Sequence, residues 1–106
     1  MTFPLNGPMF DLLVLSVIAE EDAYGYQISQ IIKRASSSTK DSTLYPILKR
    51  LQERQCVETY DRQFQGRNRK YYRITETGKR YLAELINDWE CYRTIVDDIV
   101  RGGIVS

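Results

Sequence analysis

The 106-residue chain contains no histidine, which is the side chain that most often serves as a general base or as a zinc ligand. Its two cysteines, Cys56 and Cys91, are far apart and have no histidine with which to share a metal, so we expect no metal site and no cofactor. The chain also lacks a glycine-rich phosphate-binding loop. These absences argue against an enzyme and leave binding functions to consider.

Long hydrophobic runs are missing as well. The longest apolar run, residues 12–15, is four residues long, which is too short for a transmembrane helix or for the hydrophobic part of a signal peptide. Without such signals the two cysteines are expected to be reduced thiols. We therefore expect a cytoplasmic protein with no membrane contact, and its length indicates one modest hydrophobic core.

The net charge of +1 conceals an uneven distribution of charge along the chain. Residues 33–80 contain 13 Lys or Arg against 5 Asp or Glu, a net charge of +8. The remaining residues contain 2 Arg against 9 Asp or Glu, a net charge of −7. A cationic centre between acidic ends favours a polyanionic partner for the centre. Charge runs on ordinary solvated faces are the alternative.

Hydrophobic periodicity predicts three helices in the first half of the chain. The first, over about 8–20, carries apolar residues around nearly its whole circumference, which indicates burial on two sides. The second is expected over about 24–35. The third is expected over about 42–54, with Ser42 as its N-cap and Pro46 at the end of its first turn, where a missing N–H has little effect.

The second half of the chain predicts a hairpin and a long helix. Two strands are expected over about 57–62 and 69–74, and Gly66 between them suits a backbone position with positive φ. A final helix is expected over about 76–101, and its heptad spacing predicts a dimer interface. The residues of this apolar seam are Leu82, Leu85, Trp89, Tyr92, Val96 and Ile99.

The N-terminal half of the third helix is a candidate DNA-reading element, because recognition helices contact the major groove from that end. It offers hydroxyl, phenol and cationic side chains that suit phosphates and base edges but commit to no particular base pair. Exposed Lys and Arg also occur on ordinary bundle helices. This helix alone therefore does not decide between a DNA-reading helix and an ordinary bundle helix. The candidate DNA contacts here are Ser42, Thr43, Tyr45, Lys49 and Arg50.

The hairpin indicates a polyanionic partner more strongly. Its cations surround one turn, with Asp61 the only acid nearby, and such crowding is unfavourable unless an anion is present part of the time. DNA phosphate fits this requirement best; a merely soluble hairpin is the alternative. Strand alternation places Tyr72 and Ile74 toward the core and Tyr71 and Arg73 on the other face. The hairpin cations are Arg62, Arg67, Arg69, Lys70 and Arg73.

Trp89 in the last helix has two compatible interpretations. It is either a large residue of the dimer seam or, facing the same residue of a second copy, one wall of a slot for flat aromatic molecules. The first helix, with apolar surface to spare, is the natural second wall. The candidate effector-binding residues are Trp89 and Leu85 on the last helix and Met9, Leu12 and Leu13 on the first.

The chain resembles the PadR family of bacterial transcriptional repressors in three segments, AYGYQI at 23–28, STLYPILKRLQ at 42–52 and GRNRKYYRITETG at 66–78. Their order and spacing are those of the family. The resemblance implies a mainly α fold with a small β hairpin, a winged helix-turn-helix with a long C-terminal dimerisation helix. It implies a DNA-binding domain with its N-terminal helix over 1–75 and a dimerisation helix over 76–106, acting as a homodimer on pseudo-palindromic double-stranded DNA.

The resemblance also implies roles for individual residues. Members commonly have a proline in the wing tip where this chain has Asn68, so a stiff wing is not carried over. The chain is similar to the compact subfamily, some of whose members hold a planar drug between paired tryptophans, and Trp89 matches that position. Tyr45, Pro46 and Lys49 would belong to the recognition helix, and Gly66, Arg67, Arg69 and Lys70 to the wing.

Together these features predict a homodimeric transcriptional repressor that is released from its operator by a small aromatic or hydrophobic effector. An effector between the first and last helices is expected to change the separation of the two recognition helices. The alternative is a winged helix used as a protein–protein interaction module, with its basic segment against an acidic partner. A ligand-binding dimer without DNA function would leave the charges of the hairpin unexplained.

Overall fold

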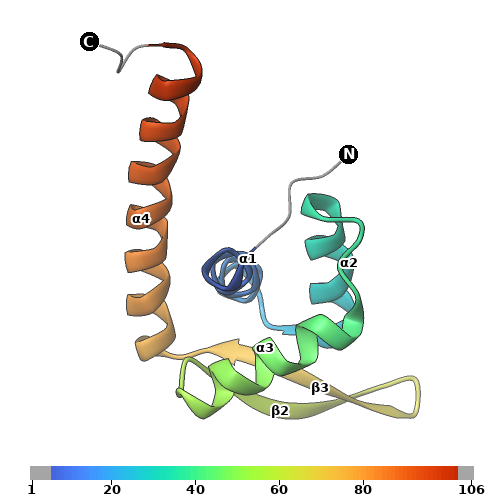
Figure 1. Cartoon of the computed structure of the whole chain (residues 1–106). Coiled ribbons are helices and arrows are strands. Elements are labelled where there is room, and N and C mark those ends of the chain that lie inside the picture. The colour runs from blue at the N-terminus through green and yellow to red at the C-terminus, as the bar shows by residue number, and fades with distance from the viewer. Residues whose placement is uncertain (1–5, 103–106) are drawn as a thin grey trace.

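The computed structural model describes residues 6–102, in which helices cover one face of a small antiparallel sheet (Figure 1). Strand order in the sheet is β1-β3-β2. This arrangement is the expected one, mainly helical with a β hairpin and a long final helix. The elements are α1 (Gly7–Glu20), β1 (Ala23–Tyr24), α2 (Gly25–Ala35), α3 (Asp41–Glu53), β2 (Val57–Phe64), β3 (Arg67–Ile74) and α4 (Glu76–Val100).

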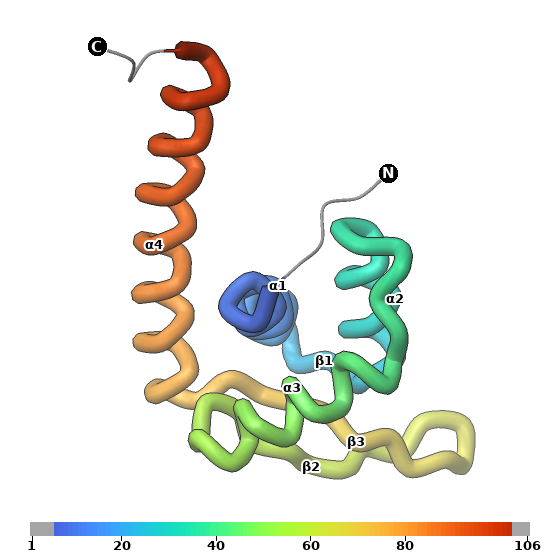
Figure 2. The backbone as a smooth tube through the Cα atoms, viewed as in Figure 1, coloured from blue at the N-terminus to red at the C-terminus, as the bar shows by residue number. Residues whose placement is uncertain are grey.

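Helix α1 lies between α2 and α4, above the sheet, as the tube in Figure 2 shows. The side chain of Asn6 caps its first turn by accepting a hydrogen bond from the N–H of Met9 at 3.0 Å. Leu15 and Ile18 are fully buried in the core, while Leu13 and Val17 are half-buried against it. The wide apolar surface of this helix is therefore used on several sides, as its sequence predicts.

The junction of α2 and α3 corrects the predicted start of the third helix. The helix begins at Asp41 with Lys40 at the N-cap position, so Ser42 is not its cap. Ser29 on α2 donates a hydrogen bond to Asp41 at 2.5 Å, and Lys33 lies 3.4 Å from the same carboxylate. These contacts lower the pKa of Asp41, the Ser29 bond most, and a carboxylate in the first turn also suits the helix dipole.

The earlier start of α3 also changes the position of Pro46, which is the sixth helical residue and not the end of the first turn. Pro46 has no N–H for the carbonyl of Ser42, four residues before it. Both residues are exposed, so water is available to that carbonyl. The proline therefore interrupts the hydrogen-bond ladder of α3 on its solvent face, where the interruption is tolerated.

The hairpin is longer than the sequence predicts, because its strands continue to a two-residue turn. Gln65 and Gly66 have φ values of 52° and 78°, and Phe64 pairs with Arg67 across them. Two successive positive φ values are typical of the type I′ turn, whose twist matches that of the strands it joins. The predicted use of Gly66 is confirmed, whereas the first strand was predicted to end two residues too early and the second to begin two residues too late.

The short strand β1 was not predicted. Ala23 pairs with Tyr72 and Tyr24 pairs with Tyr71, so β1 adds a third strand to the hairpin. Tyr71 lies on the face opposite the core, as alternation requires, and yet it is only 7% exposed. The rings of Tyr24 and Tyr60 cover it, at centroid distances of 5.4 and 5.7 Å.

Helix α4 leaves the sheet and extends well beyond the other helices (Figure 1). Thr75 caps it by accepting a hydrogen bond from the N–H of Gly78 at 3.0 Å. The radius of gyration is 15.9 Å, against about 13 Å for a compact domain of 100 residues. The excess reflects the C-terminal part of α4, where Ile95, Ile99 and Val100 are exposed. Within residues 6–102 no helix is both long and apolar enough to cross a membrane.

Candidate nucleic-acid interface

The exposed side of α3 carries most of the predicted DNA contacts of this helix. Its buried side, formed by Leu44, Ile47, Leu48 and Leu51, holds the helix against the core. Tyr45 is 61% exposed, and its ring lies beside Gly25 at the start of α2. This geometry leaves hydroxyl, phenol and ammonium groups in solvent together on one side of the helix. The exposed candidates on α3 are Ser42, Thr43, Tyr45, Pro46 and Lys49.

Arg50 is placed differently from its neighbour Lys49. Its guanidinium forms an ion pair with Asp11 of α1, and its side chain is 38% exposed. An arginine held in this way is not free to extend toward a phosphate in the manner of Lys49. The structure therefore separates two residues that the sequence groups together.

The arginines of the hairpin lie on its outer face, between aromatic rings. Pairing of β2 with β3 places Arg62 opposite Arg69 and Tyr60 opposite Tyr71. The guanidinium carbon of Arg69 lies 4.5 Å from the ring centroid of Tyr24 and 4.4 Å from that of Phe64. Such stacking on aromatic faces stabilises a cation and restricts its rotamers.

The same pattern continues along the outer face. Arg62 lies over the ring of Tyr71 at 5.0 Å, and Arg73 over that of Tyr60 at 4.9 Å. The hydroxyl of Tyr60 donates a hydrogen bond to Asp22 at 2.6 Å, which raises the pKa of this tyrosine. The rings therefore form a fixed support for the cations. This surface, named here the aromatic–arginine face, consists of Tyr24, Tyr60, Phe64 and Tyr71 with Arg62, Arg69 and Arg73.

One hairpin cation is neutralised by a partner that the sequence did not indicate. Arg73 forms an ion pair with Glu58 directly across the strands, at 3.0 Å. Arg67 and Lys70, nearer the turn, are exposed. Lys70 lies on the opposite face from the arginines, with its ammonium 5.6 Å from the ring of Tyr72. Positive charge is thus concentrated toward the tip of the hairpin, and its base is partly balanced.

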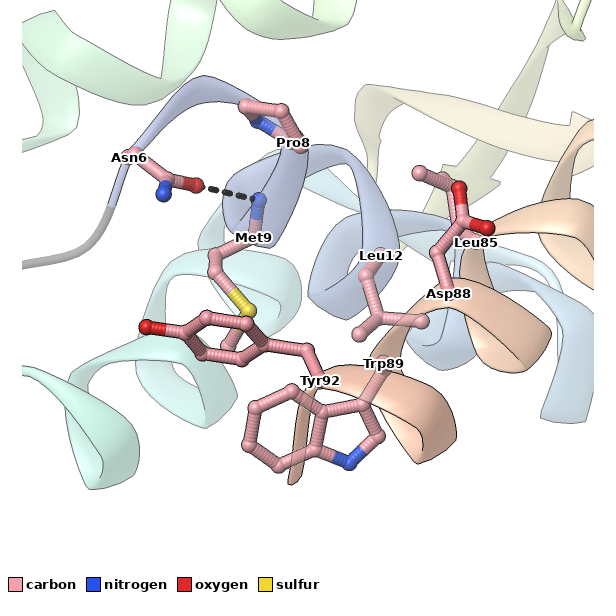
Figure 3. A pocket seen from close by; sticks show the side chains of 8 residues that line it. All are labelled: Asn6, Pro8, Met9, Leu12, Leu85, Asp88, Trp89 and Tyr92. Carbon is pink, nitrogen blue, oxygen red and sulfur yellow. Dashed lines mark hydrogen bonds between the residues drawn. The ribbon is translucent and has the colours of Figure 1, made fainter. Parts of the chain in front are cut away.

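A pocket of about 220 Å³ lies between the start of α1 and the middle of α4. Figure 3 shows the rings of Trp89 and Tyr92 next to one another, with Met9 of α1 alongside Tyr92. Four of the five predicted effector residues line this pocket, namely Met9, Leu12, Leu85 and Trp89. Leu13 does not: it borders a separate groove between α1 and α2. The sequence missed Asn6, Pro8, Asp88 and Tyr92 as lining residues.

The predicted seam of α4 divides into two parts. Leu82 and Leu85 are buried within the protomer, and Trp89 is half-buried. Beyond them, Tyr92 is 63% and Ile99 57% exposed. The first part is therefore used to attach α4 to α1, and the second part presents an apolar surface to solvent. A heptad pattern alone does not distinguish these two uses.

Asp11 is a buried carboxylate that sequence reasoning overlooked. It is 3% exposed and accepts hydrogen bonds from Arg50 of α3 and, at 2.7 Å, from the hydroxyl of Tyr81 on α4. Burial, followed by the bond to Asp11, raises the pKa of Tyr81 to about 12. A signal was present: Asp11 is the only charged side chain in residues 1–19. A buried charge needs partners of this kind.

Comparisons with known proteins identify a family and similar solved structures. The family described as "Transcriptional regulator PadR-like family" matches residues 14–84. The structure of smu.1704 from Streptococcus mutans UA159 has 42% sequence identity and a TM-score of 0.94, covering 100% of this chain and 99% of that chain. A PadR family transcription regulator from Clostridium difficile R20291 has 29% identity and a TM-score of 0.78, covering 86% and 97%. Transcriptional regulator Rv3488 of Mycobacterium tuberculosis is 32% identical, over 69% of this chain and 68% of its own length.

Proposed function

Because the chain belongs to the PadR-like family of transcriptional regulators, we propose that it is a homodimeric repressor that binds a pseudo-palindromic operator and is released by a small aromatic or hydrophobic effector. Members of this family are DNA-binding regulators and not enzymes. The proposed site of action is double-stranded DNA in the cytoplasm. In this proposal residues 1–75 contain the DNA-binding part and residues 76–106 contain the dimerisation helix α4; residues 1–5 and 103–106 lie outside the described part of the chain.

The observation that carries this proposal is the pairing of two exposed cationic elements in one fold. Helix α3 presents Tyr45 and Lys49 to solvent, and the hairpin presents Arg67 and Lys70 near its tip. In a winged helix the first element reads the major groove and the second follows the phosphates. Arg69, which is held between the rings of Tyr24 and Phe64, adds a further positive charge next to this tip.

Dimerisation through α4 is supported by its exposed apolar half. Tyr92, Ile95 and Ile99 are all more than half exposed in one protomer, which is costly for a monomer in water. A two-fold pairing of α4 buries them and brings two copies of the Trp89 pocket near one another. Each protomer then presents one α3, and half-sites of dimeric helix-turn-helix readers lie about 34–36 Å apart.

The charge of the hairpin tip gives a direct test of DNA contact. Arg67→Ala and Lys70→Ala are each expected to weaken binding to all duplex sequences and to reduce the slope of log affinity against log salt by about 1. The physical reason is that a protein with one phosphate contact fewer displaces fewer counterions from the DNA when it binds. Operator affinity measured by fluorescence anisotropy at several salt concentrations checks this. Arg101→Ala, which removes an exposed cation at the end of α4, is the control and should leave the slope unchanged.

The effector is tested with 2-naphthol as a neutral planar aromatic probe. Trp89 is the only tryptophan, so quenching of its fluorescence reports on the pocket. We expect quenching and weaker operator binding to occur over the same probe concentrations. Met9→Ala should weaken binding of the probe. Leu13 is half-buried but lies outside the pocket, so Leu13→Ala should leave the affinity for the probe unchanged. Quenching with unchanged operator affinity would reject the effector role.

A winged-helix protein–protein interaction module is the second candidate, since an acidic protein surface also attracts the cationic hairpin. The two differ in what they recognise. A preference for palindromic duplexes selected from a random pool, together with a steep salt dependence, supports DNA binding. Equal weak binding to all duplexes at physiological salt favours the protein partner.

A further inference from the structure

Three elements of the fold meet at one buried carboxylate. Asp11 of α1 accepts hydrogen bonds from Arg50 of α3 and from Tyr81 of α4, and its own side chain is 4% exposed. The three residues are 31 or more positions apart in the sequence, so the fold alone brings them together. We name this group the Asp11 triad.

Arg50 enters the triad from the helix proposed to read DNA. Its guanidinium faces α1, whereas its neighbour Lys49 is exposed to solvent. Within residues 6–102, the Nε of Arg50 is the buried side-chain polar atom that lacks a hydrogen-bond partner. The arginine is thus held through its terminal nitrogen to Asp11 and has one donor unused. Among the described residues, the polar contact of this guanidinium is therefore the one with Asp11.

Tyr81 enters the triad from the helix that lines the effector pocket. Leu12, which follows Asp11, and Leu85, one helical turn after Tyr81, both line that pocket. A molecule that separates α1 from α4 at Leu12 and Leu85 therefore acts one residue or one turn from the bond between Asp11 and Tyr81. Because neither helix carries a Pro or Gly between these points, each moves there as a rigid rod.

We propose that the Asp11 triad couples the pocket between α1 and α4 to the recognition helix, with Arg50 acting as a positioning residue and not as a phosphate contact. This inference rests on the proposed function, since it assumes that α3 reads DNA. Arg50 fixes the orientation of α3 relative to α1. Separation of Tyr81 from Asp11 removes one of the two donors of the carboxylate and changes the direction in which Arg50 is held.

The physical basis is that a buried carboxylate depends on all its donors. Removing Tyr81 from Asp11 leaves the charge with one partner in a poorly hydrated site, so Asp11 and Arg50 must rearrange or admit water. Those alternatives give α3 two discrete positions, which a ligand biases only if it binds them with different affinities. In this proposal Tyr81 transmits the change at the pocket to α3, and Lys49 contacts the DNA.

The first experiment compares adjacent residues of α3 by operator affinity at several salt concentrations. Arg50→Ala is expected to weaken operator binding at least about tenfold with an unchanged salt slope, since no phosphate contact is lost. Lys49→Ala, the matched control, should reduce the slope by about 1. Arg50→Lys should restore part of the affinity because a lysine can still pair with Asp11. A slope reduced by about 1 in Arg50→Ala would show a phosphate contact and overturn the proposal.

The second experiment tests the connection to α4 without DNA. Tyr81→Phe removes one hydroxyl, and hydrogen exchange of α3 amides is expected to become faster while that of α2 amides stays the same. Thr94→Val, which removes an exposed hydroxyl from the same helix outside the pocket and the proposed interface, is the control. Unchanged exchange in α3 would overturn the coupling even if operator binding is as proposed. If the wild-type chain binds no operator, the proposed function fails, and this exchange result still decides whether α4 controls α3.

The third experiment joins both sites with 2-naphthol as the probe. The factor by which the probe weakens operator binding, about 5 or more for typical couplings, should fall toward 1 in Tyr81→Phe. The affinity of the probe itself, read from Trp89 quenching, should change little because Tyr81 does not line the pocket. An unchanged factor in Tyr81→Phe would place the coupling elsewhere.

Discussion

Gly78→Ala is expected to destabilise the chain by more than about 3 kcal/mol, a large part of the stability of a domain of this size. A Cβ at this position would lie 2.0 Å from the carbonyl oxygen of Cys56 and 2.8 Å from the Cγ1 of Ile74. The nearest atom belongs to the backbone, and the same carbonyl accepts a hydrogen bond from the N–H of Thr75 at 3.0 Å. The clash is therefore expected to push the start of α4 away from the sheet and to break the hydrogen bond between Thr75 and Cys56.

The matched control is Gly7→Ala, which makes the same change in the first turn of another helix. Among the described residues, and outside its own helix and chain neighbours, a Cβ at Gly7 meets no atom within 4 Å, so no comparable clash is expected. Urea denaturation followed by circular dichroism checks both variants. A midpoint for Gly78→Ala close to that of the wild-type chain would contradict the prediction, since it would require α4 to shift at no cost.

Much of the fold could be predicted because local signals and tertiary structure agree. The wide apolar surface predicted for the first helix corresponds to burial of Leu15 and Ile18 in the core. Errors arose where a tertiary contact decided the outcome. Helix α3 begins at Asp41 because that carboxylate is held by Ser29, a residue twelve positions away. Strand β1 exists only because β3 lies beside it.

The candidate site was predictable in composition but not in arrangement. Sequence alternation placed Tyr71 opposite the core, yet gave no sign that Tyr24 and Tyr60 bury it. Lys49 and Arg50 are adjacent cations that the sequence does not distinguish. They differ in the structure because Arg50 forms an ion pair with Asp11 of α1, whereas Lys49 is exposed. Buried ion pairs of this kind depend on residues distant in the sequence, which periodicity does not detect.

The second large effect is expected in α4, where Ile99→Asp should prevent dimerisation and weaken operator binding by about 100-fold or more through the loss of bivalent contact. Ile99 is 57% exposed in the protomer, so an aspartate there leaves the protomer itself folded. In a two-fold interface the carboxylate is buried twice without a partner, at several kcal/mol for each ion. Leu82, 8% exposed, is unsuitable for this test because it belongs to the core.

Sedimentation equilibrium at micromolar concentration checks the assembly, and anisotropy with full and half operators checks its consequence. Thr94→Asp adds the same charge to an exposed position on the other side of α4 and should remain a dimer. If both variants bind a half-site with equal affinity, only Thr94→Asp should gain from the second half-site, since only it has two recognition helices in one particle. A dimer formed by Ile99→Asp would show that the exposed half of α4 is not the interface, and Tyr92 and Ile95 would then need another partner.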